Sequence, residues 1–102
     1  MNETDAELIR FIRSCPGLHA AAPQEGYERV NWRESLPRAD RVRVRRHTCD
    51  CKPIVYELCQ GGGLYFVRRL YRSDEVLVHE SEWLRSPEAE RLWLQVLMGQ
   101  AR

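Results

Sequence analysis

The chain has 102 residues, of which 43% are hydrophobic and 30% charged, a size that fits one small domain and leaves no room for a second core. Its three Trp, four Tyr and two Phe residues exclude a disordered tail, and its longest apolar runs, Ile54–Tyr56 and Leu64–Val67, exclude a transmembrane helix of about 20 residues. The formal net charge of +1 means that the chain as a whole has no electrostatic preference for nucleic acid or for membranes.

The N-terminal sequence is acidic and lacks the basic start and apolar stretch of a signal peptide, so we expect a cytoplasmic protein that contacts no membrane. Thr4 followed by Glu7 is typical of a capping box, and apolar residues then recur at spacings of three and four. This pattern predicts a helix at about residues 5–14. Residues 16–39 show no period and contain three prolines, which predicts an irregular connector with a short helical turn near residues 20–22. The connector's large side chains are expected to be anchored to the core: Tyr27, Val30 and Trp32.

Between about residues 40 and 79 apolar and polar residues alternate, which predicts four strands connected in chain order as an antiparallel meander. Three sets of turn residues separate the strands: Lys52-Pro53, Gly61-Gly62-Gly63 and Ser73-Asp74. Because a strand follows the three glycines, they predict a hairpin turn and not a phosphate-binding loop, which needs a helix after it. The sequence therefore predicts an all-antiparallel sheet.

The turn lengths also predict which residues face each other. A three-residue glycine loop pairs Tyr56 with Arg68, and a two-residue Ser73-Asp74 loop pairs Arg68 with His79. Cys49 then lies opposite Tyr56, although a shift of one residue at the first turn would invert the first strand. The register of that strand stays open.

A second helix is predicted at about residues 87–98, because Ser86-Pro87 supplies an N-cap and a proline at the first helical position. Its buried face is expected to comprise Leu92, Trp93, Val96 and Leu97, with Leu94 and Met98 facing outward. The whole chain, residues 1–102, is thus predicted to be a single α+β domain, in which an N-terminal and a C-terminal helix flank a four-stranded antiparallel meander.

One group of metal-ligand residue types is visible: His47, Cys49, Cys51 and Cys59. Thiolates and imidazoles are the ligands that zinc prefers, but alternate residues on an extended strand place His47 and Cys51 about 13 Å apart. We therefore expect structural thiols, no cofactor, and a fold that no metal holds together. A zinc module with these four ligands is an alternative, and a redox pair of Cys49 with Cys59 is another.

The middle of the chain is basic: residues 38–72 carry nine basic and three acidic side chains, against four and six before them and three and six after them. Fifteen of the sixteen cations are Arg, which is typical of a GC-rich genome. With the predicted register, one sheet face combines these cations with aromatic residues, a composition that can contact phosphates and stack bases. The candidate binding residues are Arg41, Arg43, Arg45, Tyr65, Arg69 and Tyr71.

The leading functional hypothesis is a small non-catalytic binding or accessory module that meets its partner through this basic aromatic sheet surface. A protein partner or self-association is favoured, and nucleic acid is the alternative. A small enzyme is the rival class, which would require a pocket that collects Cys49, Tyr56, Arg68 and His79. No catalytic residue is assigned from the sequence.

Overall fold

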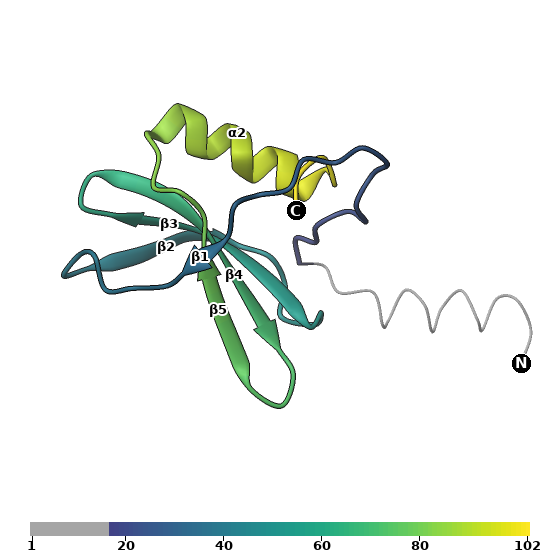
Figure 1. The fold of residues 1–102 in the computed structure, drawn as a ribbon, viewed down its shortest axis with the longest axis horizontal. Helices are drawn as coiled ribbons and strands as arrows, with labels where there is room; N and C mark the ends of the chain where they lie inside the picture. The colour runs from purple at the N-terminus through teal and green to yellow at the C-terminus, as the bar shows by residue number, and fades with distance from the viewer. Residues whose placement is uncertain (1–16) are drawn as a thin grey trace, which may run out of the picture.

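The computed structural model describes residues 17–102, which form a five-stranded antiparallel sheet and one α-helix (Figure 1). Four strands make the predicted meander: β2 (Val42–His47), β3 (Ile54–Gly61), β4 (Leu64–Arg72) and β5 (Val76–Glu80). A fifth strand, β1 (Arg33–Glu34), pairs with β5, and the strand order is β1-β5-β4-β3-β2. The α+β class and the meander are confirmed, and the predicted helix at residues 5–14 lies outside the described residues.

The additional strand β1 lies within the predicted connector, where two paired residues are too few to give any sequence period. The helical turn predicted near residues 20–22 is absent, and the Ala21 N–H instead donates to the Leu97 carbonyl at the end of helix α2 (Ser86–Leu97). Two anchors of the connector were predicted correctly, since Val30 and Trp32 pack against the core. No helix among residues 17–102 is long and apolar enough to span a membrane.

The hairpin between β3 and β4 has a two-residue loop, so the register predicted from a three-residue loop is wrong by one position. Gly62 and Gly63 have φ values of +57° and +80°, and a tight hairpin turn needs positive φ at both of its central residues. Gly61 therefore stays in the strand, opposite Leu64. The shift places Arg68 opposite Glu57 and not opposite Tyr56, so Arg68 and Tyr56 lie on different faces of the sheet.

The register of the other two hairpins also differs from the prediction. Arg72 pairs with Val76 across a three-residue loop, which sets Arg69, and not Arg68, opposite His79. On β2, Arg45 is the extra residue of a β-bulge, and after it Thr48 takes the place opposite Tyr56 that was predicted for Cys49. Local bulges and loop lengths decide these pairings.

Helix α2 covers one face of the sheet, and its docked side matches the prediction (Figure 1). Trp93 and Val96 are buried at 1% and 2% exposure against the sheet residues Leu58 and Val67, with Leu92 and Leu97 at the margin. Leu94 is 54% exposed and Met98 is 53% exposed, as expected for the outer side of an amphipathic helix.

The opposite face is covered by chain segments, and no helix of the described residues packs on it. Phe66 stacks on Trp83 with ring centroids 4.5 Å apart. The buried carboxylate of Glu80 accepts a hydrogen bond from Trp83 Nε1 at 3.0 Å and from the Ser35 hydroxyl at 3.3 Å, and it pairs with Arg38 at 3.3 Å. This buried polar network ties residues 35–38 to the sheet.

Candidate functional site

A buried tyrosine hydroxyl and two arginines come together on the helix-covered face. Tyr56 on β3 is 6% exposed and pairs across the sheet with Arg69 on β4. The guanidinium of Arg69 lies over the ring of Trp32, 4.5 Å from its centroid, which is a cation–π contact. Arg102 lies close enough to Tyr56 to lower the pKa of its hydroxyl, and the Arg102 backbone is held by hydrogen bonds to the connector residues Glu28 and Val30.

This group contains donors and positive charge but no Asp or Glu side chain. Among residues 17–102, the ion pairs involve other arginines, and neither Arg69 nor Arg102 pairs with Asp or Glu. The buried indole Nε1 of Trp32 also has no hydrogen-bond acceptor in this part of the chain. Arg102 is exposed, but Arg69 is half-buried, and a half-buried cation without a counter-ion is costly because burial removes hydration that no ion pair replaces.

The pKa values of the group reflect these surroundings. Burial raises the pKa of the Tyr56 hydroxyl, and the charges of Arg102 and Arg69 oppose that rise. Burial lowers the pKa of Arg69; the nearby Tyr56 raises it, and Arg102 lowers it further. Two like charges thus lie close enough to act on each other, which favours an anion between or beside them.

A cavity of about 380 Å³ adjoins this group, within the range of small-molecule binding sites. Its wall is formed by the connector, the hairpin between β2 and β3, and the end of α2, so that three separate segments close around one space. Apolar and aromatic side chains predominate, and the polar groups include the Tyr56 hydroxyl and Arg102. The lining residues that bear on the chemistry are His19, Cys49, Ile54, Tyr56, Tyr71 and Arg102.

The six binding residues suggested by the sequence are distributed over different surroundings. Arg43 and Arg45 are exposed on edge strand β2, with Arg41 exposed just before it. Tyr65 is half-buried and forms a bridge with Leu84, while Arg69 lies beneath Trp32 and Tyr71 lines the cavity. The structure thus brings Tyr71 near the Tyr56 group and leaves the β2 arginines as a separate exposed surface.

The four residues that an enzyme site would need, Cys49, Tyr56, Arg68 and His79, are also not gathered in one place. Tyr56 and Cys49 both line the cavity, but Arg68 lies on the other face, where its Nε donates to Glu57 at 2.8 Å. Burial lowers the pKa of Arg68, but the hydrogen bond with Glu57 and the nearby charges of Cys59, Glu57 and Glu80 together outweigh burial, so the pKa is raised. Arg68 is therefore a structural ion-pair partner, and the predicted four-residue group is not assembled.

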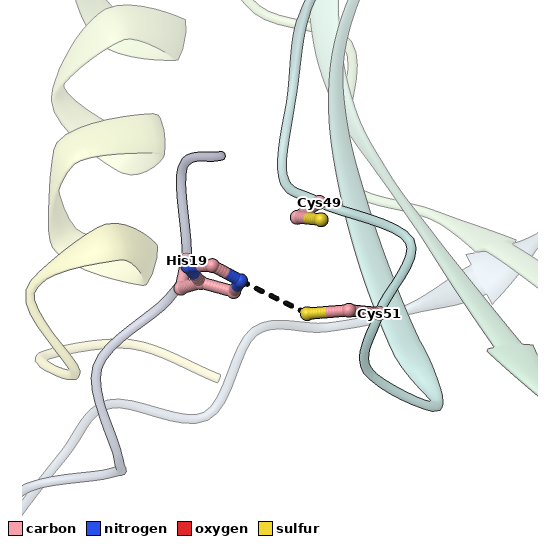
Figure 2. A group of neighbouring side chains, drawn as sticks. All are labelled: His19, Cys49 and Cys51. Atoms are coloured by element: carbon pink, nitrogen blue, oxygen red, sulfur yellow. Dashed lines mark hydrogen bonds between the residues drawn. The ribbon is translucent and has the colours of Figure 1, made fainter. Parts of the chain in front are cut away.

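Of the four predicted metal-ligand residues, only Cys49 and Cys51 lie together, and a different histidine joins them. Cys49 and Cys51 converge with His19 from the connector, and the three ligand atoms lie within 4.8 Å of one another (Figure 2). His47 is exposed on β2 and its Nδ1 lies 3.0 Å from the Thr48 carbonyl oxygen, while Cys59 is fully buried in β3.

The two clustered cysteines do not lie on an extended strand, because β2 ends at His47 and residues 48–53 form the turn. The assumption of a 13 Å separation therefore does not apply. His19 was missed as a candidate ligand, although it stands four positions after Cys15 in the sequence, a spacing of two soft ligands that could have drawn attention to it.

Comparison with protein-family models, curated proteins and solved structures finds no match to this chain.

Proposed function

We propose that this protein is a non-catalytic binding module that holds a small ligand with an apolar body and a carboxylate or phosphate group. The observation that carries the proposal is the meeting of Arg69 and Arg102 at the buried Tyr56 hydroxyl, beside an apolar cavity and without an Asp or Glu partner among the described residues. The cavity takes the body of the ligand, and the two guanidinium groups with the hydroxyl take its charged end.

The role assigned to Tyr56, Arg69 and Arg102 is binding, because these three side chains include no nucleophile with an adjacent base. Tyr56 keeps its proton at neutral pH, since burial raises its pKa above the ordinary value of 10.0 for tyrosine. It therefore serves as a hydrogen-bond donor to an anion. Hydrogen bonds to a charged group contribute about 1.5 to 3 kcal/mol each, enough to select an anion over its neutral analogue by about 10- to 100-fold.

The experiment compares two probes that share an apolar chain, octanoate and octanol, by isothermal titration calorimetry on the full chain. We expect octanoate to bind about 10- to 100-fold more tightly than octanol. In Arg69→Gln this ratio should fall toward one, because the charged end loses one of its two cations. The ratio is internal to each variant, so a general loss of stability does not imitate the effect.

Arg43→Gln is the matched control, because Arg43 is an exposed arginine on β2 that does not belong to the group of Tyr56, Arg69 and Arg102. This variant should retain the wild-type ratio of affinities. Equal affinity of the wild-type protein for octanoate and octanol would contradict the proposal, and so would an unchanged ratio in Arg69→Gln.

A second candidate is binding of an anionic polymer, nucleic acid included, along β2. All six residues of β2 are exposed, and arginines occupy three of these positions, with Arg41 directly before them. Charged side chains and a bulge on an edge strand oppose pairing with another sheet, so this edge favours an anionic partner over self-association. Binding of single-stranded RNA should then weaken with salt, with a smaller slope in Arg43→Gln; absence of binding at about 50 mM salt would remove this candidate.

A further inference from the structure

We propose that His19, Cys49 and Cys51 form a zinc site that joins the connector to the hairpin between β2 and β3. His19 Nε2 lies 3.0 Å from Cys51 Sγ, and Cys49 Sγ completes a group whose ligand atoms all lie within 4.8 Å of one another. Figure 2 shows His19 on the connector and the two cysteines on the opposite segment, with the Cys51 sulfur pointing toward the imidazole. The site goes beyond the proposed anion binding and does not depend on it.

The geometry of the group is close to that of a tetrahedral zinc centre. Zinc–sulfur bonds of about 2.3 Å and zinc–nitrogen bonds of about 2.0 Å separate neighbouring ligand atoms by about 3.4 to 3.8 Å. No two ligand atoms of the observed group are more than about 1.0 to 1.4 Å farther apart than in such a centre, a difference that small side-chain rotations can close. Two thiolates and one imidazole are a soft ligand set, which selects zinc over magnesium or calcium.

The backbone around the site is braced before any metal binds. Cys49 N–H donates to the Leu18 carbonyl at 2.7 Å, which holds the connector beside the hairpin one residue away from His19. On the hairpin side, the Thr48 hydroxyl accepts from Tyr56 N–H at 2.9 Å, and the Arg72 guanidinium donates to the Asp50 and Lys52 carbonyls. These contacts hold the ligand-bearing segments in register, so binding requires little ordering of the chain.

A closed structural zinc site has four ligands, and residues 17–102 supply three to this group. Three protein ligands leave one position of the tetrahedron for a water molecule or a further ligand. Binding of zinc displaces the protons of Cys49 and Cys51 into solvent, so affinity rises with pH.

The experiment titrates the full-length, metal-free protein with Co²⁺ and then with Zn²⁺ under a non-thiol reductant. We expect one Co²⁺ per chain, a thiolate-to-cobalt charge-transfer band with tetrahedral d–d bands, and their loss when Zn²⁺ displaces Co²⁺. Zn²⁺ should also raise the melting temperature, and a chelator should reverse the rise. His19→Ala and Cys51→Ser should each weaken Co²⁺ binding by more than about tenfold.

His47→Ala is the matched control, because His47 is an exposed histidine of the same region that does not belong to the group. It should bind Co²⁺ as the wild-type protein does. Far-ultraviolet circular dichroism of each metal-free variant shows whether it still folds, so that loss of binding reports the ligand and not the fold. Absence of the charge-transfer band in the wild-type protein, or equal Co²⁺ affinity of His19→Ala and His47→Ala, would overturn the proposal.

Discussion

The substitution Gly99→Ala tests how the connector is attached to the end of α2. Gly99 follows the helix with φ of +75°, a left-handed conformation that ends helices and that residues with a Cβ adopt at a cost. A Cβ at this position would overlap the carbonyl oxygen of Ala22 and approach its carbon to 3.1 Å. The connector therefore has to move away from the helix, and the wall of the cavity moves with it.

The magnitude follows from two contributions. The left-handed conformation costs about 1 to 2 kcal/mol for a residue with a Cβ. Displacement of the connector weakens two backbone hydrogen bonds, Ala21 N–H to the Leu97 carbonyl and Gln24 N–H to the Gly99 carbonyl, both 2.8 Å long. At about 0.5 to 1.5 kcal/mol each, they bring the expected destabilisation by Gly99→Ala to about 2 to 5 kcal/mol.

Gly26→Ala separates the two contributions, because Gly26 has a nearly identical φ of +76° but no atom within 4 Å of the added Cβ. It should cost only the conformational contribution of about 1 to 2 kcal/mol. Urea unfolding measures both variants, with an unchanged m-value as the sign that only stability has changed. If Gly99→Ala were no more destabilising than Gly26→Ala, the close approach of connector and helix would be refuted.

Three further predictions concern the core and the second face. In urea unfolding, Trp93→Ala should destabilise the protein by about 3 to 5 kcal/mol, because Trp93 is 1% exposed. Leu94→Ala should cost less than about 1 kcal/mol, because Leu94 is 54% exposed. Similar losses in both variants would contradict the assignment of the docked side of α2. Glu80→Ala should cost about 3 to 5 kcal/mol, because it leaves Arg38, Trp83 Nε1 and Ser35 without their buried acceptor; a loss below about 1 kcal/mol would speak against this network. Burial raises the pKa of the Cys59 thiol from 9.0 to about 11, so as pH rises the unfolded chain loses this proton before the folded protein does. The free energy of unfolding should therefore fall between about pH 9 and pH 11. This fall should be smaller in Cys59→Ala, and an equal fall in both proteins would exclude Cys59 as its source.

The fold class, the strand order of the meander and the buried side of α2 were predicted correctly, because short-range sequence patterns determine them. The spacing of Trp93 and Val96 makes one apolar stripe only if the segment is helical, and the stripe has to face the sheet. The glycines at 61–63 marked a hairpin because few other residues adopt positive φ. Class, strand order in the meander and the buried side of α2 thus follow from local physical chemistry.

The pairing of neighbouring strands was predicted less well, because it depends on single residues of loop length. Whether Gly61 belongs to the loop or to β3 changes which face Phe66 and Arg68 occupy, and the sequence pattern is compatible with both assignments. Strand β1 has only two residues and forms because the connector passes the free edge of β5. Such pairings are decided by the packed sheet as a whole.

Both candidate sites were beyond the reach of sequence patterns, because each joins segments that are distant along the chain. His19 and Cys51 are 32 positions apart and meet because the connector bonds to the β2–β3 turn and to the end of α2. Arg69 and Arg102 come together at Tyr56 because β3 and β4 pair while the last residues bond to the connector. The sequence alone determined the main elements and their amphipathic faces, through local backbone preference and side-chain period. Only tertiary structure decided which charges and ligand atoms meet, because residues so far apart in the chain come together only when the elements pack.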